Sequence, residues 1–299
     1  MNDRIKEYLS KILEYDYDVK LNEGFDINGK KVSYNQNHDD NLDTASVNLR
    51  EIYSYKIKDP VQDKYWDVIS FFIRVSGEHE DDGNPVIYAL KKEKNYELVD
   101  RAKVLKIMAD QFYKIAYNSK LLVRHYDTIV VAPTSSWINR DFTEKLLKHV
   151  SADKICRDLL EKRTKEDVKN NFIDWDAVKK YADKNHESFE SVKTKLLNSF
   201  KNMGTYFRYH DLKNIEYRNF IKSSLKIPGI ENSKMYDEYS NYFNDKNILV
   251  LDDSLATGKT ISDVCNTIME TFKVKKITIA TLMSIRVNKN DIKRHLYNN

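Results

Sequence analysis

The 299-residue sequence is poor in cysteine, glycine and proline, and it contains no long hydrophobic run. Its two cysteines, Cys156 and Cys265, are far apart and form no CxxC pair. This favours a reduced, intracellular protein over a disulfide-stabilised one. The N-terminal segment is charged throughout and lacks the unbroken apolar stretch of a secretory signal. No apolar run approaches the roughly 18 residues needed to span a bilayer. We therefore expect a cytoplasmic protein without a membrane segment.

The sequence also lacks a strong excess of charge of either sign. It has 50 basic and 46 acidic residues, a formal net charge of +4, and this near-balance gives no strong case for nucleic-acid binding. The seven histidines show no HxxxH or similar metal spacing, so no zinc site is expected. The 41% of hydrophobic residues and 32% of charged residues are typical of a globular protein rather than a disordered one.

Residues 1–120 read as an α+β region of unknown role, because they contain no recognisable chemical motif. Apolar spacing predicts a helix over 3–15. Asn28-Gly29 is a hairpin turn signal. Two β-rich segments are expected at 65–75 and 85–93. A long helix should follow, with five apolar residues on one face: Val104, Leu105, Met108, Phe112 and Ile115.

Residues 121–299 predict a different organisation, in which short apolar strands alternate with helices. Strands are expected at 127–133, 247–253 and 275–285, and helices at 142–150 and 260–272. A strand, a helix and a second strand in succession make a βαβ unit, which implies a parallel sheet. The stretch 164–245 reads as helical and as an insertion or hood outside the sheet. The predicted fold class is therefore α/β with a parallel sheet, plus the α+β N-terminal region and the helical insertion.

The stretch ILVLDDSLATGKT at 248–260 carries the clearest chemical signal, and its end resembles a nucleotide-binding P-loop. A P-loop reads GxxxxGK[ST] and would need a glycine at position 253. That position is Asp253, whose carboxylate would face a phosphate. The P-loop interpretation therefore fails on both pattern and charge.

A different phosphate site fits every position of this stretch. A buried strand ends in two acids, a short loop follows, and a helix begins at Thr260. Loop N–H groups and the helix N-terminus form a nest suited to one phosphate monoester. Thr257 and Thr260 add hydroxyl donors, and Gly258 permits close backbone approach. Asp252 and Asp253 are placed to accept hydrogen bonds from sugar hydroxyls, so the pattern describes a ribose 5-phosphate. The alternative is another α/β protein in which paired acids bind a metal, as in response regulators.

The same stretch resembles the PRPP-binding signature of the type I phosphoribosyltransferases: four apolar residues, two acids, three variable residues and T-G-x-[TS]. The Leu-Ala-Thr-Gly portion is similar to adenine-type members. In the hypoxanthine-guanine type an acid precedes the threonine, whereas this chain has Ala256. The resemblance implies that Asp252 and Asp253 are catalytic. It also implies that seven residues bind PRPP: Ser254, Leu255, Ala256, Thr257, Gly258, Lys259 and Thr260.

Two upstream segments resemble other parts of the same family, especially its ComF-like branch. YDTIVVAPTSSWINRDFTEKLL resembles the first core strand and pyrophosphate loop, with four candidate contacts: Thr134, Ser135, Ser136 and Arg140. The alternative is a plain serine-rich turn. In DLLEKRTKEDVKNN, Lys162 and Arg163 resemble the mobile basic loop that covers the substrate, although ordinary surface charge at a helix start is the favoured interpretation for either residue alone.

The resemblance implies a PRPP-dependent glycosyltransferase of nucleotide metabolism, with Mg²⁺ held through PRPP rather than by protein ligands. An unidentified base would be the second substrate, and a homodimer is possible. The alternatives are an inactive PRPP- or nucleotide-binding regulator and a ComF-like protein of DNA uptake or processing.

Overall fold

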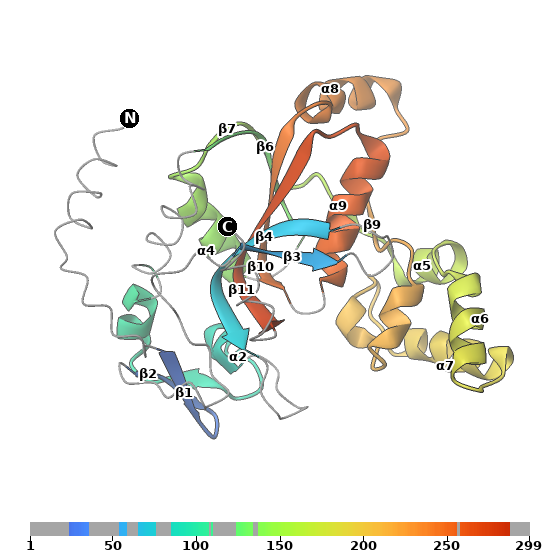
Figure 1. The fold of residues 1–299 in the computed structure, drawn as a ribbon, viewed down its shortest axis with the longest axis horizontal. Coiled ribbons are helices and arrows are strands. Elements are labelled where there is room, and N and C mark those ends of the chain that lie inside the picture. Colours follow the sequence, from blue (N-terminus) through green and yellow to red (C-terminus); the bar gives the residue numbers. More distant parts are fainter. Residues whose placement is uncertain are drawn as a thin grey trace. The chain divides into compact units, whose positions relative to one another are not determined.

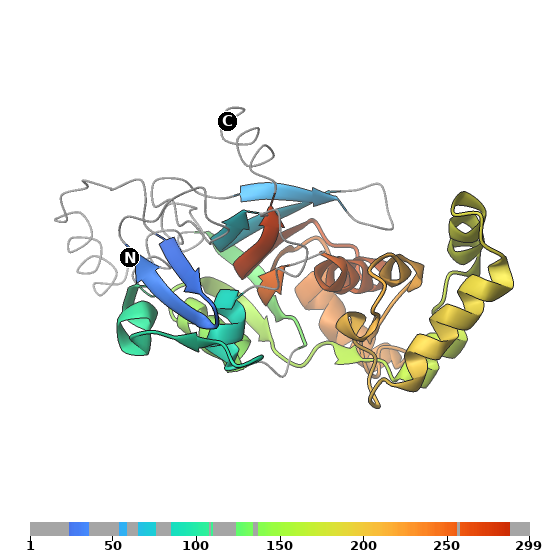
Figure 2. The ribbon, with the colours of Figure 1, turned by 90° about the horizontal axis from the view of Figure 1, so that it is seen from below.

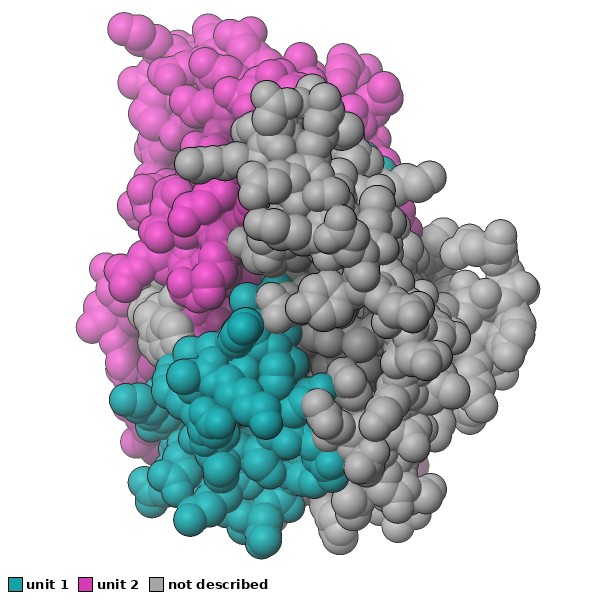
Figure 3. Space-filling model, turned by 90° about the vertical axis from the view of Figure 1, so that its left-hand side faces the viewer, with its two compact units in different colours: residues 1–55, 69–124, 282–299 teal, residues 56–68, 125–281 magenta. Residues whose placement is uncertain are grey.

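The computed structural model describes residues 24–35, 54–58, 65–75, 85–107, 109, 124–133, 137–255 and 258–287 (Figure 1). The chain divides into two compact units (Figure 3). One comprises residues 1–55, 69–124 and 282–299, and the other residues 56–68 and 125–281. The helix expected at 3–15 lies outside the described residues. Within the described part of the chain, no helix has both the length and the apolar character required to cross a membrane.

The first unit contains a small three-stranded sheet in the order β1-β2-β5. Strands β1 (Gly24–Asn28) and β2 (Lys31–Asn35) form the expected antiparallel hairpin, and β5 (Glu97–Leu98) pairs with β2 in parallel. The connecting residues are Gly29 and Lys30. Gly29 has a φ of 60°, which suits glycine at the first central position of a tight hairpin turn.

The segment 85–93 was expected to be a strand, and this is wrong. It forms helix α2 (Pro85–Lys91). Proline is favoured in the first turn of a helix, where its missing N–H needs no partner. Val86, Ala89 and Leu90 are all buried and share a face at helical spacing. Of the long helix expected next, residues 101–107 are helical with Val104 buried, and most of the remainder lies outside the described residues.

A six-stranded sheet has the order β3-β4-β11-β10-β6-β7. Its strands are β3 (Ser54–Lys58), β4 (Tyr65–Val75), β6 (His125–Val131), β7 (Ser151–Cys156), β10 (Asn247–Leu255) and β11 (Lys276–Val287). Strand β6 pairs in parallel with both β10 and β7. Ile129, Val130, Leu249 and Val250 are almost fully buried, as expected of strands covered on both faces. The α/β architecture with a parallel sheet is thus confirmed.

Helices α4 (Trp137–Leu147), α8 (Ser233–Phe243) and α9 (Lys259–Thr271) accompany this sheet (Figure 1). Helix α4 begins five residues before the predicted start at 142 and ends three residues before the predicted end at 150. Helix α9 is buried at every position from Ile261 to Ile268, since it contacts both β10 and the short strand β9 (Leu225–Lys226). The strand β7 was not predicted. Its exposed and partly buried residues alternate up to the buried Cys156, which is typical of an edge strand.

The helical segment expected at 164–245 is present and contains a core of its own. It comprises α5 (Lys165–Asn171), α6 (Trp175–Lys184), α7 (Phe189–Lys201) and the short 3₁₀ helices η1 (Tyr209–Asp211) and η2 (Glu216–Phe220), followed by β9 and α8. Helices α5, α6 and α7 lie together in both views (Figures 1 and 2). Val178, Leu196 and Phe207 are among the buried residues of this cluster. We call residues 165–221 the helical insert.

Candidate active site

The two acids lie inside strand β10 rather than at its end. Asp252 and Asp253 are 6% and 5% exposed. The backbone N–H of Asp253 donates to Asp252 Oδ1 over 2.8 Å, and Ser254 Oγ donates to Asp253 Oδ1 over 2.8 Å. The strand was expected to end at residue 253 but continues to Leu255. Its neighbour β11 is 12 residues long and can support this extension.

The turn after β10 is consequently shorter than the sequence suggested. Ser254 and Leu255 belong to the strand, and Ala256 and Thr257 lie outside the described residues. Gly258 precedes α9 with φ 75° and ψ −7°, a left-handed conformation that is costly for other residues. It provides no side-chain cap for α9. The first N–H groups of α9 have no partners within the helix and so favour an anion at this end.

Lys259 and Thr260 begin α9 but differ in exposure. Thr260 is exposed, as a hydroxyl donor to a ligand should be. Lys259 is only 4% exposed, and its Nζ lies 5.8 Å from the centre of the Tyr209 ring in the insert. Such contact between an ammonium group and an aromatic face is favourable. Lys259 therefore brings positive charge into the interior beside the turn.

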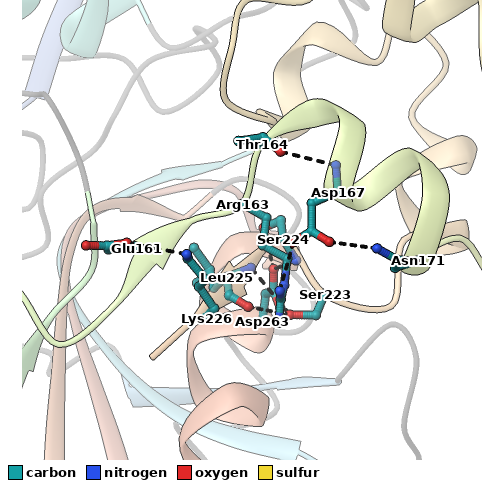
Figure 4. Close-up of polar contacts among 10 residues, drawn as sticks. All are labelled: Glu161, Arg163, Thr164, Asp167, Asn171, Ser223, Ser224, Leu225, Lys226 and Asp263. Carbon is teal, nitrogen blue, oxygen red and sulfur yellow. Dashed lines mark hydrogen bonds and ion pairs between the residues drawn. The ribbon is translucent and has the colours of Figure 1, made fainter. Parts of the chain in front are cut away.

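A buried carboxylate joins α9 to the helical insert. Asp263 Oδ2 accepts hydrogen bonds from the Ser224 backbone N–H over 2.6 Å and from Ser224 Oγ (Figure 4). It also accepts a hydrogen bond from Tyr209 Oη over 3.0 Å. Burial raises the pKa of Asp263, while the Ser224 hydrogen bonds, the charge of Lys259 and the Tyr209 hydrogen bond oppose that rise. Removing one partner from such a network leaves a buried polar group unsatisfied. Asp263 thus fixes the segment around Ser224 against α9, one turn beyond the phosphate turn.

The two predicted basic residues, Lys162 and Arg163, have different surroundings. Arg163 Nη1 donates to Asp167 over 3.0 Å, and its guanidinium lies 3.8 Å from the centre of the Phe172 ring (Figure 4). Arg163 therefore stabilises the start of α5. Lys162 lies in β8 (Glu161–Lys162), which pairs with β9.

Lys162 lies within the electrostatic influence of the acid pair. Partial burial lowers the pKa of Lys162, and the charge of Arg208 lowers it further, whereas Asp252 and Asp253 raise it. Lys162 is thus near enough to both acids for their charges to act on its ammonium group. Arg163 follows it in extended backbone, and consecutive residues there point to opposite sides.

Three functional candidates in the insert were missed by the sequence analysis: Arg208, His210 and Arg218. Arg208 Nε and His210 Nε2 lie 2.9 and 3.3 Å from the two carboxylate oxygens of Asp211. Partial burial lowers the pKa of His210; Asp211 opposes this, and the charges of Arg208, Lys162 and Arg218 add to the lowering. The sequence RYHD at 208–211 was the available signal, but nothing in it indicates proximity to Lys162.

The pyrophosphate candidates follow β6. The backbone N–H of Ala132 donates to Leu251 O over 2.8 Å, so the chain leaves β6 beside the residue that precedes Asp252. Thr134, Ser135 and Ser136 lie outside the described residues. Arg140 is exposed within α4 rather than in a loop. The start of this segment is therefore close to the acid pair along the sheet.

Comparison with known families gives one match. Residues 177–298 match the family model described as phosphoribosyl transferase domain. The matched range includes β10, the turn after it and α9, and it begins within helix α6. Searches of curated proteins and of solved structures found no match. The family match supports phosphoribosyl transfer as the general activity, with a small phosphoribosyl compound as substrate.

Proposed function

We propose that this protein transfers ribose 5-phosphate from PRPP to a nitrogenous base and releases pyrophosphate. The proposal takes the phosphoribosyl transferase match as its premise. The observation that carries it is the succession of buried acids Asp252 and Asp253, a left-handed Gly258 and the start of α9. These groups lie along the last residues of β10 and the start of α9 in the order that a ribose diol and its 5-phosphate require.

The reaction replaces one bond at C1 of the ribose. The bond from C1 to the pyrophosphate oxygen breaks, and its electron pair leaves with pyrophosphate. A lone pair on the base nitrogen then forms the new bond to C1, and any proton on that nitrogen passes to solvent. Positive charge develops on the sugar before the new bond is complete. Carboxylates fixed near the ring stabilise that charge without reorganising.

The residues of this chain divide the work along β10 and α9. Asp252 and Asp253 accept hydrogen bonds from the 2- and 3-hydroxyls and fix the ring. The N–H groups at the start of α9 and the Thr260 hydroxyl hold the 5-phosphate, so that the sugar is oriented toward the incoming nitrogen. The segment after β6, with Ser135 and Arg140, is proposed to contact the leaving pyrophosphate.

Mg²⁺ fits this arrangement as an ion carried by PRPP. Carboxylate and phosphate oxygens are the ligands that Mg²⁺ prefers, and two carboxylates lie together in β10. Bound there, it would neutralise part of the negative charge on the leaving group. Asp252 and Asp253 are the residues that would face it, through the ribose hydroxyls or bound water and not as direct ligands.

Ligand-dependent stability tests the binding part of this proposal. PRPP with Mg²⁺ should raise the melting temperature, because a ligand at 100 times its Kd adds about 2.7 kcal/mol to the stability of the folded state. ATP with Mg²⁺ should add much less. Equal stabilisation by ATP, lost on Lys259→Gln, would instead favour a nucleotide-binding P-loop.

Turnover is measured as pyrophosphate release with adenine, uracil, orotate, xanthine, nicotinamide and nicotinate in parallel. Release with one of them, stopped by chelating Mg²⁺, supports the enzyme. Thr257→Arg should abolish release because it places a large side chain in the phosphate turn. PRPP binding with no pyrophosphate from any acceptor would instead favour an inactive regulator or a ComF-like protein.

A further inference from the structure

Strand β8 and the helical insert bring basic side chains together beside the candidate site, and the proposed PRPP contacts do not use them. They are Lys162, Arg208, His210 and Arg218, and we call them the basic cluster. Two hydrogen bonds fix its geometry on either side of Arg163. The Arg163 N–H donates to Ser224 O over 2.9 Å, and the Phe207 N–H donates to Arg163 O over 3.0 Å. Lys162 and Arg208 each adjoin a residue of this second bond.

Arg208 and His210 of the basic cluster each contact a carboxylate and remain exposed to solvent. Asp211, whose side chain is 17% exposed, holds both Arg208 and His210. The side chains of Arg208 and His210 are 47% and 71% exposed. A carboxylate beneath two exposed basic groups pre-orients them for an anion at lower entropic cost.

The Asp263 network ties this cluster to the reaction centre. Asp263 of α9 binds Ser224, whose carbonyl accepts from Arg163, and Asp263 also binds Tyr209, which lies between Arg208 and His210 in sequence. Every link is a hydrogen bond of 3.0 Å or less. The cluster is therefore connected by hydrogen bonds to α9, the helix whose first turn is proposed to hold the 5-phosphate.

We propose that the basic cluster binds a negatively charged group on the acceptor, so that the acceptor is a base carrying a carboxylate. This inference rests on the proposed phosphoribosyl transfer and adds the chemical class of the second substrate. Lys162 and Arg208 supply the charge, and His210 adds to it when its ring is protonated. Charge-assisted hydrogen bonds of this kind are the stronger ones in proteins. Burial is the main cause that lowers the pKa of both Lys162 and His210, and repulsion from neighbouring cations adds to the lowering. Such an anion would offset that repulsion.

The geometry favours the acceptor over the phosphates of PRPP. The 5-phosphate has the start of α9, and the pyrophosphate has the segment that leaves β6 beside Leu251. The insert is tied to α9 by the Tyr209–Asp263 hydrogen bond, and α9 contacts β9 and β10. Strand β6 is the neighbour of β10 on the side opposite β11. An acceptor attacks C1 from the face opposite the leaving group, so the two occupy different sides of the ribose.

The test uses two pairs of bases that differ in charge: orotate against uracil, and nicotinate against nicotinamide. For wild type, kcat/KM from pyrophosphate release should favour the carboxylated member of at least one pair by about 10- to 100-fold, the range expected of a hydrogen bond to a charged group. Arg208→Gln and Lys162→Gln should each reduce that ratio about tenfold. Lys180→Gln, an exposed residue of α6, removes the same charge and should leave the ratio unchanged.

Stabilisation by PRPP checks that each variant is folded, and His210→Gln provides a second variant at a more exposed side chain. A variant could lose PRPP and pyrophosphate binding while its kcat/KM ratio for carboxylated over uncharged bases stays at the wild-type value. That result would show that the cluster binds the leaving group, and it would overturn the proposal. The absence of any preference in both pairs also overturns it.

Failure of the proposed function is distinguishable from failure of this inference. If no acceptor yields pyrophosphate, calorimetric binding of the same four bases to wild type and Arg208→Gln, with PRPP present, decides the point. Tighter binding of a carboxylated base that Arg208→Gln weakens supports the anion site without turnover. Equal binding of charged and uncharged members contradicts it.

Discussion

The two sides of the acid pair are built on different physical principles. On one side, the turn from β10 into α9 offers backbone N–H groups held by a buried strand and a buried helix. On the other, the helical insert offers charged side chains mounted on an aromatic core of its own, in which Phe200, Phe207 and Tyr209 pack against one another. Backbone groups suit an invariant phosphate and sugar, whereas side chains can change with the acceptor. Under the proposed function, this difference would keep the phosphate and sugar contacts fixed while the acceptor contacts vary.

The largest expected effect comes from removing the negative charge of the acid pair, which lies between the phosphate side and the insert side. Asp252→Asn with Asp253→Asn should lower the rate of pyrophosphate release about 10²- to 10³-fold, because the developing charge on the sugar loses its stabilising partners. The variant should remain folded, since asparagine is close to aspartate in size. Pyrophosphate release and the melting temperature with and without PRPP measure both parts.

Asp183→Asn is the matched control for this pair, because it makes the same chemical change at an exposed position of α6. It should leave turnover unchanged. PRPP stabilisation of the double variant equal to that of wild type would show that the acids have a structural role only.

The next largest effect compares the stability of the insert with that of the six-stranded sheet. Leu196 lies in the insert core and Leu249 in β10, and both side chains are fully buried. Either substitution to alanine should cost about 3 kcal/mol of unfolding free energy. Because the insert has its own core, Leu196→Ala should reduce amide hydrogen-exchange protection mainly in α5, α6 and α7. Leu249→Ala should reduce it across the six-stranded sheet.

The two alanine variants control for each other, since they remove the same atoms. Equal loss of protection in β10 and α9 from Leu196→Ala would mean that the insert and the sheet unfold as one unit. The Asp263 hydrogen bonds would then transmit the loss of protection from the insert to α9. The insert and the sheet would differ in structure but would not unfold independently.

The side of the site formed by β10 and α9 was the more predictable from sequence. NILVLDD is an apolar run with no alternation, and it forms the buried strand that this pattern indicates. The apolar spacing of 260–272 matches α9 closely. The end of β10 was misplaced because strand ends depend on the neighbouring strand. Residues 85–93 were misassigned because a short apolar run fits a strand and a buried helix equally well.

The side built on side chains could not be predicted in the same way. Arg208 and Lys162 are far apart in sequence, and they are brought together by the Phe207–Arg163 hydrogen bond next to the two-residue strand β8. Two-residue strands have no periodicity to detect. Asp263 resembled any polar residue of an amphipathic helix until its partners, Ser224 and Tyr209, were located. Long-range contacts of this kind determine the acceptor side.

The smallest expected effect concerns the opposite end of β10, where no function is proposed. Asp127 of β6 accepts a hydrogen bond from the backbone N–H of Asn247, the first residue of β10, over 2.8 Å. Lys246 Nζ lies 3.5 Å from its other carboxylate oxygen. The Asn247 hydrogen bond and the Lys246 charge hold the pKa of Asp127 below its ordinary value. A carboxyl whose pKa is lowered on folding contributes stability above its unfolded-state pKa, and this contribution is lost as the pH falls through the folded-state pKa.

Asp127→Asn should therefore reduce the unfolding free energy by about 0.5–1 kcal/mol at neutral pH, the size expected for one partly exposed hydrogen-bonded charge. The difference from wild type should shrink as the pH falls below about 4, where wild-type Asp127 also becomes neutral. Urea unfolding of both proteins at several pH values measures this difference. Turnover should be unchanged, because the substitution lies at the start of β10 while the acids lie near its end. A loss of turnover without a loss of stability would show that the two ends of β10 are coupled, and the separation between scaffold and site would then fail.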